Sequence, residues 1–254
     1  MRKAHLWLLA VSVAALLSLP VAAQTTTPTV APALPAAEDI LTRIPADCLG
    51  FVAVRNVGDF GAKIDKFLAD INVAKMLPGS VLPLLKGAAT VGDGFNDNGG
   101  AALVFLDPAQ FGLTIEAYGS SSPPIVFLLP GNNPKLTFAN WQPTEEAGYV
   151  KLRMPDGDEG FAKPLGGYTI LGNNKQMVDA VAGSAKPVAG KIGPDHRDVI
   201  AKSDVAAYAD MKTLAPILNK AIDGALAEMK QAGSGMPPPL QAVMSLYGSV
   251  LPFY

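Results

Sequence analysis

Hydrophobic and polar positions change their period sharply between Asp47 and Ile71. From Cys48 to Val54 no residue is charged and apolar side chains fall on both faces, which is typical of a strand covered on both sides. A short buried helix is the competing interpretation, but the β-branched and aromatic content favours the strand. Beyond Arg55 the apolar positions recur at helical spacing, with charged residues on the opposite side. The apolar positions of this helix are Phe60, Ile64, Phe67, Leu68 and Ile71, and we expect all five to be buried.

The same two periods recur later in the chain. Further strands are expected over residues 101–106, 125–129, 149–154, 161–165, 168–171 and 205–209. Helices are expected over 57–71, 80–89, 134–141, 174–182, 194–200 and 211–230, with Asn56 or Asp59 capping the first. The pattern predicts an α+β fold, mainly an antiparallel sheet with two-sided central strands and helices packed on it. Strand 205–209 and its helix resemble the first expected strand, 49–55, and its helix, so a degenerate strand–helix repeat, about 155 residues apart, is a further hypothesis.

The first residues have the three parts of a secretory signal. Arg2 and Lys3 precede an uncharged apolar segment, and small residues follow it, so we expect cleavage between Ala23 and Gln24. An uncleaved membrane anchor is the alternative, but the apolar core is shorter than the ~20 residues needed to span a bilayer. The sequence therefore predicts export to the periplasm, cell envelope or extracellular space, with no stable transmembrane span after cleavage.

The remaining chain divides by composition into three parts. Residues 24–37 are Thr, Pro and Ala without charge, typical of a disordered tether, and residues 38–232 form the predicted α+β domain. Residues 233–254 are a Gly/Pro break and an apolar tail. The net charge is −2, or −4 once two positive charges leave with the signal peptide, and this weak acidity argues against nucleic acid as a partner. The single cysteine, Cys48, is interpreted as a buried small hydrophobe, with a reactive thiol as the alternative.

Three stretches carry a resemblance: IPADCLGFVAVRNV (44–57), LLKGAATVGDGFNDNGGAALVFLDP (84–108) and LGNNKQMVDAVAG (171–183). Together they resemble a family of large exported bacterial proteins of uncharacterised function from planctomycete-type cell envelopes. The resemblance covers most of residues 40–225 and implies an exported α+β domain, without catalytic residues to carry over. Members of that family often continue further, so the end at Phe253-Tyr254 is expected to belong either to a truncated chain or to a short form.

Motifs for chemistry are weak throughout the sequence. The loop Gly92–Gly100 resembles a calcium loop but lacks the first Asp and the closing Glu, and no helix follows Gly94 to bind a phosphate. His196 is the only histidine after the signal, beside Asp195 and Asp198, and no nucleophile elbow exists for a triad. The acids Asp156, Asp158 and Glu159 are interpreted as a solvated hairpin tip, and Ser120–Ser122 as a loop. We assign no catalytic, cofactor-binding or metal-ligating residue and expect no cofactor.

The sequence favours a non-enzymatic function. The first hypothesis is an exported binding or scaffold module of the cell envelope, with an unknown envelope protein as partner. The alternative is a carrier of an apolar ligand held between sheet and helices, suggested by the surplus of apolar residues and by the methionines Met76, Met177, Met211, Met229 and Met244. A hydrolase that uses acidic residues we cannot place is the third hypothesis.

Overall fold

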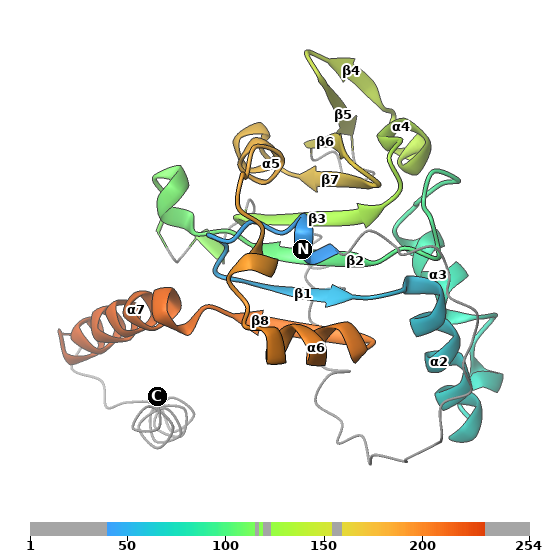
Figure 1. Ribbon diagram of the computed structural model, residues 1–254, viewed down its shortest axis with the longest axis horizontal. Coiled ribbons are helices and arrows are strands. Elements are labelled where there is room, and N and C mark those ends of the chain that lie inside the picture. The colour runs from blue at the N-terminus through green and yellow to red at the C-terminus, as the bar shows by residue number, and fades with distance from the viewer. Residues whose placement is uncertain (1–39, 115–116, 119–122, 154–158, 232–254) are drawn as a thin grey trace.

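The computed structural model describes residues 40–114, 117–118, 123–153 and 159–231. Within these residues one eight-stranded antiparallel sheet forms the centre of the molecule, in the order β4-β5-β6-β7-β3-β2-β1-β8 (Figure 1). The strands are β1 (Gly50–Val54), β2 (Ala101–Phe105), β3 (Ile125–Pro130), β4 (Thr144–Glu146), β5 (Tyr149–Arg153), β6 (Glu159–Leu165), β7 (Tyr168–Gly172) and β8 (Val205–Ala209). The predicted α+β class, with a mainly antiparallel sheet, is confirmed.

Six α-helices and several short 3-10 turns join these strands in the described part of the chain. The helices are α2 (Val57–Asp70), α3 (Val81–Ala88), α4 (Pro134–Thr137), α5 (Lys175–Ala182), α6 (Pro194–Lys202) and α7 (Met211–Gln231). The 3-10 turns are η1 (Ile40–Thr42), η2 (Ala74–Met76), η3 (Pro108–Phe111), η5 (Ala139–Trp141) and η6 (Val188–Gly190). No helix among the described residues is long and apolar enough to cross a membrane. The predicted signal, tether and apolar tail lie outside the described residues.

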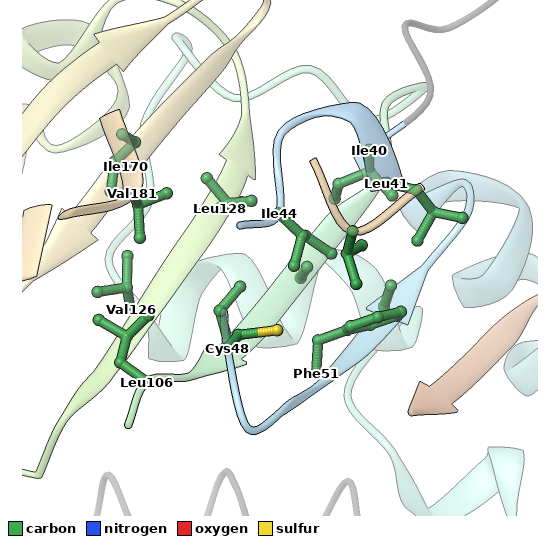
Figure 2. Packing of buried hydrophobic residues seen from close by; sticks show 14 of the residues in the cluster. Ile40, Leu41, Ile44, Cys48, Phe51, Leu106, Val126, Leu128, Ile170 and Val181 are labelled. Carbon is green, nitrogen blue, oxygen red and sulfur yellow. The ribbon is translucent and has the colours of Figure 1, made fainter. Parts of the chain in front are cut away.

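The main core lies on one side of the sheet, which we call the first face. Strand register places Phe51 opposite Val104 and Leu128 opposite Ile170, and these four side chains are almost fully buried. They pack against α5, η1 and η6, and Figure 2 shows Cys48 within this cluster beside Ile44. Each such apolar side chain contributes roughly 1.5–3 kcal/mol when it leaves water, so the first face supplies most of the stabilising burial.

The opposite side of the sheet, which we call the second face, is covered over only part of its width. Phe138 and Trp141 pack with their rings tilted by 39° and their centroids 4.9 Å apart, and they cluster with the buried Val150, Leu152 and Ala162 of β5 and β6. Over β1, β2 and β3 the second-face side chains are only half-buried; Leu129 of β3 packs against the Phe138 cluster and Phe105 of β2 contacts the Tyr118 ring, whereas Val52, Leu103 and Phe127 belong to neither described core cluster. The central strands are therefore apolar on both faces, as predicted, but unequally covered.

The predicted burial of the helix after β1 is wrong. Asn56 caps α2 by accepting from the Asp59 amide at 2.9 Å, so the helix begins where its sequence indicates. However, α2 packs against α3 rather than on the sheet, and Phe67 and Ile71 stay 47% and 49% exposed. The physical reason is geometric: α2 leaves the end of β1 and runs beyond the edge of the sheet (Figure 1).

Candidate functional site

A polar cluster around the buried Asp210 lies where β8 passes into α7. The Lys191 ammonium donates to Asp210 Oδ2 at 2.6 Å and to the Ala46 carbonyl at 3.0 Å, and Thr213 Oγ1 donates to the same carboxylate at 2.7 Å. The hydrogen bond from Lys191 lowers the pKa of Asp210. Burial lowers the pKa of Lys191 and is the largest single effect, but the hydrogen bond to Asp210 and the negative charge of Asp210, with smaller contributions from other acidic groups, together raise the net pKa. The cluster therefore stays ionised at neutral pH and clamps the start of α7 to the loop after η6.

Cys48 lies close to this cluster but is a poor nucleophile. Its side chain is 1% exposed, and burial raises the pKa of the thiol to about 11 despite the nearby positive charge of Lys191. A thiol with that pKa stays protonated at neutral pH, whereas the thiolate is the reactive form. The prediction that Cys48 is a buried small hydrophobe is confirmed.

A second polar cluster joins the β5–β6 hairpin to α5. The Lys175 ammonium lies 5.4 Å from the Tyr149 ring centroid and 5.1 Å from that of Phe161, and it pairs with Glu146 at 2.6 Å. The Lys163 ammonium lies 5.1 Å from the Tyr149 centroid on the same side of the sheet. Lys163 also pairs with Asp179, which accepts a hydrogen bond from the Tyr149 hydroxyl. Hydrogen bonding to Asp179 raises the pKa of Tyr149, so this hydroxyl is held as a donor and not activated as a base. Every polar group here already has a partner, which indicates a structural role.

The residues weighed from sequence are not brought together. His196 is exposed in the first turn of α6, beside the exposed Asp195 and Asp198. Glu159 pairs with Lys151 at 2.8 Å in β6, whereas Asp156, Asp158 and Ser120–Ser122 lie outside the described residues. In the part of the chain that the structure describes, no group of three His, Cys, Asp or Glu side chains could hold a metal ion.

The Gly92–Gly100 loop has a packing role. A Cβ at Gly94 would lie 2.4 Å from the Thr137 amide nitrogen, and a Cβ at Gly131 would lie 2.0 Å from the Gly94 carbonyl oxygen. Glycine is needed here because two backbone segments approach closely. The carboxylate of Asp97, an acidic side chain of this loop, pairs with Lys86 at 2.8 Å. The loop therefore joins α3 to the region around α4.

Four exposed large apolar side chains lie on the α2–α3 hairpin. Phe67 and Ile71 on α2 are 47% and 49% exposed, and Leu84 and Leu85 on α3 are 36% and 44% exposed. The two helices touch closely at Gly61, where an added Cβ would lie 3.0 Å from the Leu82 Cβ. This contact with α3 leaves Phe67 and Ile71 of α2 exposed. We call these four exposed side chains the hairpin patch.

The hairpin is held in place by its polar side. The Lys63 ammonium pairs with Asp204, just before β8, at 2.6 Å. Asp65 Oδ1 accepts from the Val81 amide at 2.8 Å and so holds the start of α3. These contacts fix the orientation of α2 relative to the sheet and to α3. The exposure of the hairpin patch is therefore a property of the anchored hairpin.

No protein-family model, no curated protein and no solved structure matches this chain.

Sequence reasoning missed the hairpin patch for a definable reason. A helical period shows that one side of α2 is apolar, but it does not show what packs against that side. The signal that could have pointed to it is the second apolar helix, α3, which follows after only a short connection and is itself apolar at Leu84 and Leu85. Two apolar helices joined by so short a connection can bury only the side chains along their line of contact, and the other apolar side chains stay exposed.

Proposed function

We propose that this chain is an exported, non-enzymatic α+β domain that acts in the cell envelope as a binding or scaffold module. The observation that carries the proposal is the hairpin patch: four large apolar side chains held outward by an anchored helical hairpin. Exposed apolar clusters of this kind mark interaction sites in soluble domains. The secretory signal and the resemblance to planctomycete-type envelope proteins support the compartment.

The partner that fits this surface is a protein with an apolar groove or helix face. α2 has alternating charges beside its apolar stripe, with Lys66 and Asp70 paired at 2.7 Å. Such mixed charge does not favour a strongly acidic or basic partner. Apolar contact at the centre and a polar rim are what a specific protein interface requires.

The test is capture of partners from an envelope fraction by the immobilised mature chain. The double variant Phe67→Ser/Ile71→Ser should lose the captured partner, whereas Lys66→Ser/Asp70→Ser, on the same helix, should keep it. Circular dichroism of all three proteins controls for folding. The proposal fails if the unaltered chain captures no reproducible partner, or if both double variants capture it equally.

A carrier of an apolar ligand is the second proposal. It is favoured by the half-buried apolar side chains of the second face, among them Leu103, Phe105 and Phe127. The methionine evidence is divided, because Met177 is buried in the main core and Met211 is 41% exposed. Lipids that raise the unfolding temperature in a thermal-shift screen would support the carrier, and the absence of any shift would remove it.

A further inference from the structure

The second face presents two continuous apolar rows across the strands at one end of the sheet. The register aligns Phe127, Leu103, Val52 and Ala207 in one row across β3, β2, β1 and β8. A neighbouring row runs through Ile125, Phe105, Gly50 and Ala209. None of these eight residues is charged. We call the surface that they form the open face.

Among the described residues, Tyr118 packs against one corner of the open face, with its ring centroid 6.2 Å from that of Phe105, and the rest of the face is only partly covered. Its Phe, Leu, Ile and Val side chains are half-buried, and Ala207 and Ala209 are exposed. Their neighbours on the first face, such as Val104 and Val126, are 0% exposed under α5 and the 3-10 turns. On the other half of the second face, the short segment with Phe138 and Trp141 covers β5 and β6 completely enough to bury Leu152. A single short apolar segment therefore suffices to close half of this face.

The chain contains a segment with the matching pattern. Between Gln231 and Tyr254 the sequence has no charged residue. Within it, apolar residues recur at spacings of three and four, and Gln241, Ser245 and Ser249 fall on the other side. The recurring residues are Leu240, Val243, Met244, Tyr247, Val250 and Leu251. This is the pattern of an amphipathic helix whose apolar stripe needs an uncharged apolar partner.

The length of the chain allows this segment to reach the open face. α7 starts directly after β8 and has 21 residues, so it extends about 30 Å. Residues 232–239 span at most about 26–29 Å when extended, which brings residue 240 back to about the start of α7. Twelve residues of helix, 240–251, are about 18 Å long, and four strands spaced about 4.8 Å apart are of similar width.

The same arithmetic argues against the hairpin patch as the site for this segment. α2 and α7 lie at opposite ends of the central strands, with the width of the molecule between them (Figure 1). A linker that only just returns to β8 cannot reach α3. The hairpin patch therefore stays available for the partner of the proposed function, and the two proposals are independent.

We propose that residues 240–251 of this chain pack as an amphipathic helix on its own open face, across β8, β1, β2 and β3, and close the second face of the sheet. In this arrangement the apolar stripe meets Val52, Leu103 and Phe127, and the serines face solvent. Because neither the segment nor the open face contains a charged residue, this packing buries apolar side chains without burying a charge.

The test measures the distance between two spin labels in the mature chain, residues 24–254. One label is placed at Lys212→Cys, which is exposed in the first turn of α7 directly after β8 and lies outside the open face, and the other at Ser249→Cys, on the polar side of the segment. Cys48 is kept, because it is buried and protonated and does not take the label. Docking gives a narrow distance distribution centred at about 20–30 Å, from a helix about 18 Å long lying about 10 Å above the sheet.

Matched variants identify the contact. In the doubly labelled chain, Val243→Asp/Tyr247→Asp should broaden the distribution, whereas Ser245→Asp, on the other side of the segment, should leave it narrow. Dilution with unlabelled protein should not change it, because the contact lies within one molecule. A broad distribution in the doubly labelled chain, a distribution unchanged by Val243→Asp/Tyr247→Asp, or a narrow one lost on dilution would each overturn the proposal.

Discussion

Gly50 offers a sharp test of how β8 closes the edge of the sheet. A Cβ at this position would lie 2.4 Å from the Tyr208 carbonyl oxygen and 3.3 Å from the Ala209 Cα. Both obstacles are backbone atoms of β8, so no side-chain rotation can relieve the overlap. Gly50→Ala therefore forces β8 to shift relative to β1, next to the hydrogen bond from the Asp210 amide to the Leu49 carbonyl.

The expected cost follows from the rigidity of the obstacle. Overpacking in a well-packed region costs about 1–3 kcal/mol, and we expect the upper part of this range, about 2–3 kcal/mol, because backbone must move. For a domain of this size each kcal/mol lowers the unfolding temperature by about 2–4 °C, so the midpoint should fall by about 4–12 °C. Urea unfolding followed by far-UV circular dichroism measures the same free energy at constant temperature.

Gly87→Ala is the matched control. Gly87 lies in α3, and an added Cβ there would meet nothing within 4 Å. Alanine is favoured over glycine inside a helix by about 0.5–1 kcal/mol, so this variant should be slightly more stable than the unaltered protein. The two glycine substitutions should thus have opposite signs. An unchanged midpoint for Gly50→Ala would refute the β1–β8 pairing, and destabilisation by Gly87→Ala would refute the open surroundings of α3.

Substitutions at three further residues test the polar clusters and the buried thiol beside one of them. The thiol pKa of Cys48 rises from 9.0 to about 11 on folding, so between these pH values the native state binds more protons than the unfolded state. The free energy of unfolding should therefore fall by about 2–3 kcal/mol from pH 9 to 11. Urea titrations of Cys48→Ala should lack this part of the loss. The lowered pKa of Asp210 contributes stability that is present at neutral pH and lost as the pH falls below about 3.8. Asp210→Asn should therefore cost about 1 kcal/mol at pH 7, since Lys191 is partly screened by solvent, and less in acid, as urea unfolding at both pH values will measure. Tyr149→Ala should lower the thermal midpoint more than Tyr149→Phe, because only the alanine variant removes the ring beneath Lys163 and Lys175; equal midpoints would contradict the cation–π contacts.

Strands and helices were predictable because the spacing of apolar residues shows which sides of an element are apolar. The expected strand 49–55 is β1, which its uninterrupted apolar run indicated, and the expected strands within 149–171 are β5, β6 and β7, where apolar and polar positions alternate. Strand β4 was missed because its three residues, Thr144 to Glu146, are polar and have no alternation to detect. The expected helix over 134–141 is broken at Phe138 into α4 and η5, which lets Phe138 and Trp141 both turn toward the sheet.

The polar clusters were not predictable, because each joins residues that only the register brings together. Lys191 and Asp210 belong to different elements, and nothing in the local sequence of either indicates the other. The same holds for Tyr149 on β5 and Asp179 on α5. Sequence composition shows that charges exist, but strand pairing decides which of them become ion pairs and which remain in solvent.

The anchored hairpin has a consequence for the strength of binding. A flexible amphipathic helix must be ordered when a partner docks, and that loss of conformational freedom weakens the complex. Here the N-cap at Asn56, the ion pair between Lys63 and Asp204, and the hydrogen bond from Val81 to Asp65 already fix α2 and α3. The hairpin patch is therefore preorganised, so the burial of Phe67 and Ile71 on binding does not also have to offset the ordering of α2 and α3. Loosening the hairpin by Asp65→Ala should accordingly weaken partner binding although Asp65 need not touch the partner.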